Sequence, residues 1–219
     1  MLRFDKRIRP STPSPNEGGV FSRHKRQTLQ HDWTALPLRT LTKHIIETHH
    51  AYLKTELPAL DKSIRRIAQL RLGGSISSDL HRAIQNLRGD WELQMQKEET
   101  ILFPAILELE ATVAAGLRPP YSQFGSVANL AHVAAKDHDK LAGTLYQIQL
   151  LTNNCTCLKD CQPGISADFE RLAILAMDIS CHIHLEKDIL FPRAIDLERS
   201  ENWNARQALT EHQCRRFYD

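Results

Sequence analysis

The sequence predicts an all-α protein whose folded part is an up-down-up-down four-helix bundle. Four long segments carry apolar residues at helical spacing, and short polar loops separate them. The segments are rich in Leu, Ala, Ile, Gln and Glu, and only 6% of the chain is aromatic, which favours helix over strand. The pattern of the first two segments recurs in the last two, so the bundle is expected to consist of two repeated helical hairpins.

The internal repeat has an offset of 88 residues and aligns the stretch QMQKEETILFP with the later stretch HIHLEKDILFP. Identical residues recur at this one offset in the segments richest in His and Glu, which indicates a duplicated unit rather than chance. The six pairs are His44 and His132, His50 and His138, Glu98 and Glu186, Leu102 and Leu190, Phe103 and Phe191, and Pro104 and Pro192.

The first hairpin is predicted to contain two helices of unusual length for a globular protein. The first helix spans about residues 36–71. The stretch GGSISSD then breaks the chain and starts the next helix, with Ser77 or Ser78 as the predicted N-cap. The second helix spans about residues 79–115.

The second hairpin follows the turn GLRPPYS and is predicted to span about residues 122–152 and 166–198, joined by a loop that carries cysteines. Pro104 and Pro192 hold equivalent places inside the second and fourth helices, where a proline costs about 3 kcal/mol. Each is expected to kink its helix about one and a half turns beyond the preceding glutamate.

The charge of the chain is unevenly distributed. The net charge is +2, but residues 1–30 carry seven Lys or Arg against Asp5 and Glu17, so this part has +5 and the remainder has 2 − 5 = −3. The leader is rich in Pro, Ser and Gly, which is typical of disorder. We therefore expect a disordered basic tail over 1–33, the bundle over 34–199 and a C-terminal tail over 200–219. The acidic body makes a solvating tail the better interpretation than a nucleic-acid contact.

The chain lacks the signals of a membrane or secreted protein. No stretch of about 18 uncharged apolar residues is present, and the first thirty residues lack the apolar core of a secretory signal. The five cysteines are an odd number, which argues against a disulfide framework. Cys155, Cys157 and Cys161 could hold zinc or a cluster, but no second paired motif accompanies them. A cytoplasmic protein without a membrane partner is expected.

The repeated His and Glu residues are candidate metal ligands. His182 and Glu186 are four residues apart, on one face of a helix, and the repeat adds His50, His138 and Glu98 at similar depth. Any one of them alone could lie on a solvated face. Two carboxylates inside a bundle, however, cost several kcal/mol unless paired or bound to metal. Mixed imidazole and carboxylate ligands suit iron, manganese or zinc.

Five other histidines of the predicted helices are not expected to be ligands. Their spacing turns them away from the face that carries the candidates, and His81 lies about 25 Å along its helix from Glu98. This group consists of His44, His49, His81, His132 and His184.

At HIIETHH, QKEETILFP, KDHDKLAG, LLTNN and HIHLEKDILFP the sequence resembles the hemerythrin-like (HHE cation-binding) di-iron domain of the repair-of-iron-centres family. These bacterial proteins are associated with restoring iron–sulfur clusters after nitrosative or oxidative stress. The resemblance covers about residues 36–198. It implies non-haem iron, in a di-iron or mononuclear site, with nitric oxide or oxygen and iron–sulfur apoproteins as partners. The ligands that it implies are terminal His50, His138 and His182 and bridging Glu98 and Glu186.

Two of the seven ligands that the family pattern implies are replaced. Gln94 stands where a histidine is expected four residues before Glu98, and Arg71 stands where another is expected. Cys161 falls one residue from a family cysteine, and the amino-terminal cysteine module of many members is absent. We therefore expect an asymmetric site whose first-half metal is weakly held. Three functions stay open: iron donation or gas handling, sensing without catalysis, and a degenerate bundle that has lost its site.

Overall fold

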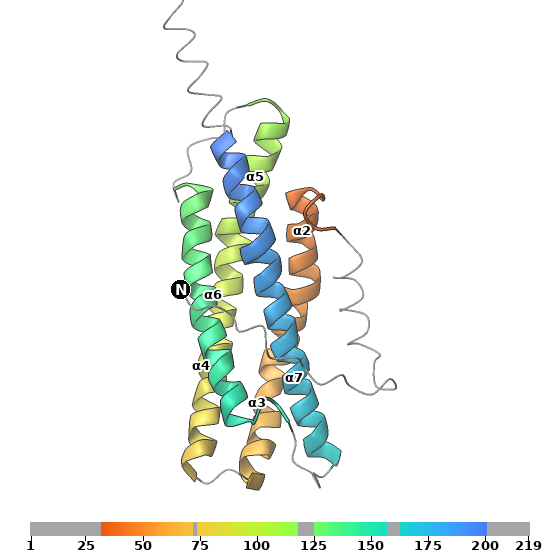
Figure 1. Ribbon diagram of the computed structural model, residues 1–219, viewed down its shortest axis with the longest axis vertical. Coiled ribbons are helices and arrows are strands. Elements are labelled where there is room, and N and C mark those ends of the chain that lie inside the picture. The colour runs from red at the N-terminus through yellow and green to blue at the C-terminus, as the bar shows by residue number, and fades with distance from the viewer. Residues whose placement is uncertain (1–31, 72–73, 118–124, 157–162, 201–219) are drawn as a thin grey trace, which may run out of the picture. The chain divides into compact units, whose positions relative to one another are not determined.

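The computed structural model describes residues 32–71, 74–117, 125–156 and 163–200, and these residues contain helices but no strand. Four long helices lie side by side in the compact unit that begins at Trp33 (Figure 1). Three of them consist of shorter helical pieces that follow one another without a loop. The first long helix consists of α2 (Leu38–His44), η1 (Ile45–His50) and α3 (Ala51–Arg71), and the second consists of α4 (Gly74–Lys97), η2 (Glu98–Leu102) and α5 (Phe103–Ala114). The third is the undivided helix α6 (Val127–Leu151). The fourth consists of α7 (Pro163–His184), η3 (Leu185–Leu190) and helical residues 191–200.

The all-α four-helix bundle is confirmed, and three helix starts differ from the prediction. The third helix begins at Val127, with Ser126 as its N-cap, rather than near 122. The fourth helix begins at Pro163 rather than near 166, because proline suits the first turn of a helix, where its missing N–H is not needed. The second helix begins at Gly74, so Ser77 and Ser78 lie inside its first turns and the N-cap prediction is wrong. Serine is tolerated in a first turn, and only residues 72–73 separate the two helices. None of the helices in the described ranges is long and apolar enough to cross a membrane.

The tails fall almost wholly outside the described residues, which exclude 1–31 and 201–219. Trp33, the last position of the predicted tail, belongs to the bundle. Its side chain is buried and stacks on the ring of His44 at 4.3 Å between centroids.

The neighbours of each helix set which side chains can meet. α3 packs against α4 and α7, and α4 packs against α6. The core consists of two apolar clusters, one with Leu53 and Trp91 and the other with Leu41 and Phe103. Along each long helix the candidate ligands stand where the chain passes from one cluster to the other. The site therefore lies between two apolar layers.

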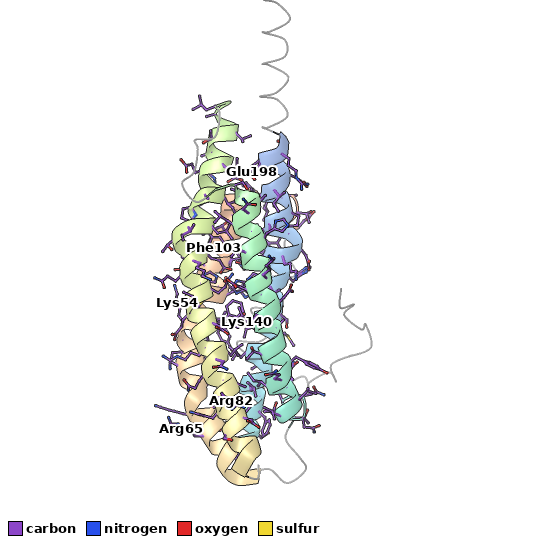
Figure 2. All side chains as sticks on the ribbon, turned by 90° about the vertical axis from the view of Figure 1, so that its left-hand side faces the viewer. Lys54, Arg65, Arg82, Phe103, Lys140 and Glu198 are labelled. Atoms are coloured by element: carbon purple, nitrogen blue, oxygen red, sulfur yellow. The ribbon has the colours of Figure 1, made fainter. Side chains whose placement is uncertain are left out.

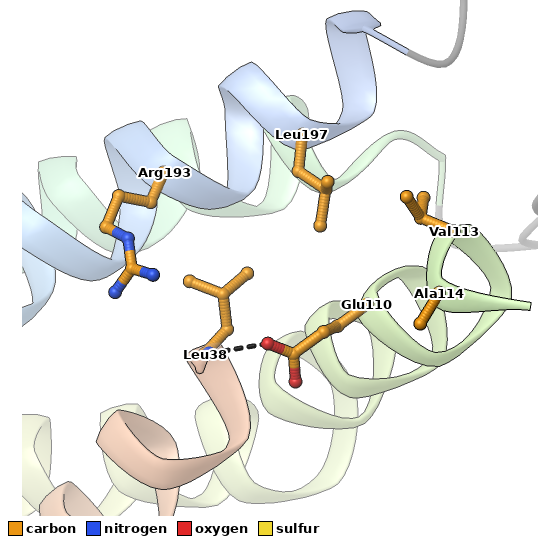
Figure 3. A pocket seen from close by; sticks show the side chains of 6 residues that line it. All are labelled: Leu38, Glu110, Val113, Ala114, Arg193 and Leu197. Atoms are coloured by element: carbon orange, nitrogen blue, oxygen red, sulfur yellow. Dashed lines mark hydrogen bonds between the residues drawn. The ribbon is translucent and has the colours of Figure 1, made fainter. Parts of the chain in front are cut away.

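A repeated carboxylate caps the first helix of each hairpin. Glu110 accepts hydrogen bonds from the backbone N–H groups of Leu38 and Arg39, at 2.6 and 3.0 Å. Glu198, 88 residues later, accepts from the first two N–H groups of α6, at 2.8 and 3.0 Å. Because the first N–H groups of a helix have no partner within it, both caps stabilise a helix start. Figure 3 shows Glu110 bonded to Leu38 at the edge of a pocket whose lining includes Leu197.

Three of the four long helices contain a π-helical turn at the level of the site. η1 ends at His50, η2 begins at Glu98, and η3 contains Glu186. Pro104 and Pro192 follow η2 and η3 within two residues. A wider turn removes the clash between a proline ring and the carbonyl four residues earlier, so here the prolines are accommodated by π turns. The remaining long helix, α6, carries His138 and is α-helical throughout.

Candidate metal centre

The five predicted ligands come together in the middle of the bundle, one or two from each long helix. All are buried, with at most 1% of each residue exposed. His50, Glu98, His182 and Glu186 each place one ligand atom within 4.8 Å of the others. His138 lies within 3.2 Å of both carboxylates.

Each carboxylate lies between two histidines. Glu98 places Oε1 3.2 Å from His138 Nε2 and Oε2 3.3 Å from His50 Nε2. Glu186 places Oε2 3.0 Å from His138 Nε2 and Oε1 3.1 Å from His182 Nε2. One oxygen of each carboxylate therefore faces His138, and the other faces the pair formed by His50 and His182. A carboxylate with its two oxygens on different histidines is arranged to bridge two cations.

The donor atoms thus form two groups that share the carboxylates. The first, here called the two-histidine group, contains His50 and His182, whose Nε2 atoms are 3.3 Å apart. The second, here called the Gln94 group, contains His138 and Gln94. The Gln94 Nε2 donates to Glu98 Oε1 at 2.6 Å and lies 3.5 Å from His138 Nε2. Each group combines one residue from the first hairpin with one from the second. The group with fewer histidines, the Gln94 group, therefore does not belong to the first hairpin alone, whereas the sequence leads us to expect the weakly held metal in the first half.

The arrangement fits a bound cation. Both oxygens of Glu186, Oε2 of Glu98 and Oε1 of Gln94 are buried without a hydrogen-bond partner. No Lys or Arg forms an ion pair with Glu98 or Glu186 within the described ranges. Two carboxylates buried in a core without a Lys or Arg partner are costly, and a cation held between them lowers that cost.

Protonated histidines balance the carboxylates when no cation is bound. Burial would lower the pKa of His138, but close contacts with Glu186 and Glu98 and their negative charges raise it to about 9. Burial would also lower the pKa of His50, yet contact with Glu98 and the charge of Glu186 raise it above its usual value. Burial and the neighbouring charge of His50 hold the pKa of His182 well below 6.5. A cation therefore replaces protons at this site.

The repeated phenylalanines position two of the histidines. Phe103 stacks on His50 with 5.7 Å between ring centroids and an interplanar angle of 20°. Phe191 stacks on His138 at 5.8 Å and 7°. Each phenylalanine follows the glutamate of its own hairpin by five residues, which explains the recurrence of the Leu-Phe-Pro segment beside the site. Stacked rings restrict the imidazole to one orientation.

Sequence reasoning missed a hydrogen-bonded pair behind His50. The ring atom Nδ1 of His50 lies 2.7 Å from Glu99 Oε1, and Lys54 donates to both oxygens of Glu99, at 2.7 and 2.8 Å. Partial burial would raise the pKa of Glu99, but hydrogen bonds from Lys54 and His50 lower it. A carboxylate on the far nitrogen fixes the tautomer and orientation of a metal-binding histidine. The sequence contains one signal for this pair, a second glutamate directly after Glu98. The residue 88 positions after Glu99 is Lys187, so the second hairpin has no counterpart of this carboxylate.

A second buried pair, also missed, lies beside His182. His49 is 1% exposed, and its Nδ1 is 2.9 Å from Asp178 Oδ1. The His49 ring lies 5.7 Å from the His182 ring, while the fully buried Trp91 ring lies 4.9 Å from it on another helix. The spacing predicts that His49 points away from the ligands, and its ring is in fact hydrogen-bonded to Asp178.

The other residues singled out from the sequence lie away from the site. His132 bonds to the carbonyl of Ala128, and His184 pairs with Asp188, both in exposed positions. Position 71 ends α3, about 30 Å along the axis from His50, so the helix carries it out of reach of the cluster. The side chain of Arg71, and Cys157 and Cys161, lie outside the described residues. Cys155 is buried, which raises the pKa of its thiol.

The comparisons with known proteins agree with this geometry. Three relatives named iron-sulfur cluster repair protein YtfE, from Escherichia coli O157:H7, Escherichia coli K12 / DH10B and Shigella boydii serotype 18, are 29% identical over 170 residues. The aligned part covers 77% of this chain and 71% of each relative. Hemerythrin domains bind iron, and the His/Glu cluster can hold a metal, so iron is the cofactor. The hemerythrin HHE cation binding domain matches residues 41–194, and the chain belongs to this family.

Proposed function

We propose that this chain is a non-haem iron protein that acts in iron–sulfur cluster repair, by donating iron or by handling nitric oxide or oxygen. The observation that carries the proposal is the pair of buried carboxylates, each with its oxygens on different histidines and without a Lys or Arg partner in the described part of the chain. The proposed ligands are His50, His138 and His182 as terminal residues and Glu98 and Glu186 as bridges.

The residues of the chain have separable tasks in this proposal. His182 is neutral in the folded protein and offers a lone pair without losing a proton first. His50 and His138 are kept in orientation by their phenylalanine partners. The two apolar clusters above and below the site exclude water from it. Bound iron would supply open coordination positions for a diatomic gas and a change of oxidation state.

The partners follow from the relatives and remain proposals for this chain. Three relatives are named iron-sulfur cluster repair proteins, so an apoprotein that needs an iron–sulfur cluster is the proposed recipient. Nitric oxide and oxygen are the proposed small-molecule partners, under nitrosative or oxidative stress, and the cytoplasm is the proposed compartment.

Iron loading tests the site before any activity is measured. Metal-free full-length protein is loaded anaerobically with ferrous iron, desalted and analysed for iron per chain. Wild type is expected to retain at least about one iron, and Glu186→Gln to lose most of it, because a neutral amide cannot bridge cations as a carboxylate does. The matched control is Glu108→Gln, which changes an exposed glutamate. Less than one iron per chain in wild type would overturn the proposal.

Transfer experiments then separate the functions. The iron-loaded protein is mixed with an apo iron–sulfur protein and sulfide, and cluster formation is followed by absorbance. A second sample receives nitric oxide, and its consumption is followed with an electrode. Cluster formation or gas consumption above the Glu186→Gln background supports repair. Iron retention with neither activity would replace the proposal by a metal or gas sensing module without catalysis.

A further inference from the structure

We propose that the cluster is a mixed-metal site, with iron at the two-histidine group and a harder divalent cation, manganese(II), at the Gln94 group. The inference deepens the proposed function and rests on its assignment of Glu98 and Glu186 as shared ligands. It concerns which cation each group selects, and it follows from three differences between the groups.

The first difference is the donor set. The two-histidine group offers two imidazole nitrogens and two carboxylate oxygens. The Gln94 group offers one imidazole nitrogen, from His138, two carboxylate oxygens and an amide. Imidazole suits iron, whereas carboxylate and carbonyl oxygens suit manganese and other hard cations. Replacing a nitrogen donor by oxygen therefore weakens the preference for iron at one of the two groups.

The second difference is that the Gln94 group contains a buried amide whose oxygen has no hydrogen-bond partner, whereas the two-histidine group contains no amide. Gln94 is only 2% exposed, and the oxygen without a partner is its Oε1. Its Nε2 lies within 3.5 Å of both Glu98 and His138, so one end of the amide already stands among the donors of this group. A half-turn of the terminal amide exchanges its nitrogen and oxygen in place. The carbonyl oxygen can therefore face a cation without movement of the backbone.

The third difference lies behind the histidines. His50 Nδ1 is bonded to Glu99 at 2.7 Å, whereas Nδ1 of His182 and Nδ1 of His138 are both buried without a hydrogen-bond partner. The two-histidine group therefore contains one histidine that is supported from behind, and the Gln94 group contains none. The repeat counterpart of Glu99 is Lys187, whose ammonium pairs with Asp139 instead. A metal-binding histidine without a partner on its other nitrogen binds more weakly, by about 10- to 100-fold. The Gln94 group is thus also expected to exchange its cation more readily.

Competitive loading tests the inference. Iron(II) binds most nitrogen and oxygen sites more tightly than manganese(II), so manganese is supplied in excess. Metal-free full-length protein is incubated anaerobically with ferrous iron and about a 100-fold excess of manganese(II), desalted and analysed for both metals by mass spectrometry. Wild type is expected to retain roughly one iron and one manganese per chain. Crystals of the loaded protein, measured at the iron and manganese absorption edges, are expected to show manganese beside His138 and iron beside His50.

Two variants and a control make the test specific. Gln94→His should raise iron towards two per chain and reduce manganese by about 10-fold, because imidazole restores the nitrogen donor. Gln94→Leu, of similar volume, should lose manganese and keep one iron. Gln96→His adds a histidine at an exposed position of the same helix and should behave as wild type. Helical circular dichroism confirms that each variant is folded.

The outcomes separate this inference from the proposed function. Two irons per wild-type chain with manganese excluded, or one iron with no second cation, would overturn the mixed-metal inference and leave iron binding intact. Manganese spread over both positions in the diffraction experiment would overturn it as well. Less than one iron in wild type, even without competing manganese, would instead overturn the proposed function.

Discussion

The substitution Glu99→Gln should weaken iron binding although Glu99 is not a proposed ligand. The carboxylate of Glu99 accepts a hydrogen bond from His50 Nδ1 at 2.7 Å, and His50 is fully buried, so solvent cannot replace the lost charge. A hydrogen bond to a charged group contributes about 1.5–3 kcal/mol, and loss of a partner behind a metal ligand costs about 10- to 100-fold in affinity. Glutamine can still accept the bond as a neutral group, at about half the strength. We therefore expect about a 10-fold loss for Glu99→Gln and about a 100-fold loss for Glu99→Leu.

The neighbouring lysine should matter much less. Lys54 holds Glu99 in place, but its side chain is 53% exposed on the outer face of the bundle (Figure 2). An exposed ion pair contributes at most about 1 kcal/mol, so Lys54→Met should reduce affinity by less than about fivefold.

A chelator competition under anaerobic conditions measures these affinities. The control is Glu92→Gln, which removes an exposed carboxylate of the same helix that pairs with Arg88. The near-infrared and ultraviolet spectra of the loaded variants report the ligand field, which a merely structural effect would not change. Equal affinity and equal spectra for Glu99→Leu and Glu92→Gln would refute the role of Glu99 in positioning His50.

Three further perturbations have defined expectations. Glu110→Ala and Glu198→Ala should each lower the free energy of unfolding by about 1–2 kcal/mol, because each removes a cap from two helix N–H groups. Chemical denaturation measures this loss, and Glu108→Ala, at an exposed position of α5, should have no such effect. The metal-free protein should lose stability as the pH rises from 6.5 through about 9, because a histidine whose pKa is raised on folding stabilises the fold only while protonated. The rise of the His138 pKa from 6.5 to about 9 corresponds to about 3 kcal/mol of folding free energy. Thermal melts of wild type and of His138→Gln at several pH values measure this loss. A melting temperature that does not change over this range, or that changes equally in the variant, would contradict the prediction. Deletion of residues 1–30 should leave iron per chain unchanged, whereas a loss of iron on metal analysis would place that segment within the fold.

Much of the site could be predicted because ligands on helices leave a fixed spacing in the sequence. His182 and Glu186 are separated by one helical turn, and the repeat then points to His50, His138 and Glu98. The structure brings these five residues together as the pattern requires.

The remaining features depend on how helices are rotated and ordered, which periodicity does not encode. Glu99 reaches His50 from a neighbouring helix, and Asp178 reaches His49 in the same way. The division of the donors into two groups follows from the contacts of α3 with α7 and of α4 with α6. The π turns change the local rise and rotation of three helices, and the prolines indicate two of them at most.

The repeat has an evolutionary consequence for the two donor groups. A symmetric dimer of one hairpin would carry identical residues at every equivalent slot, so any substitution would alter both cation positions together. In the present chain the slot of His182 in the second hairpin corresponds to Gln94 in the first, and Glu99 corresponds to Lys187. Covalent linkage of two hairpins allows each copy to diverge alone. Duplication thus offers a route by which a symmetric precursor can acquire two inequivalent cation positions within one bundle.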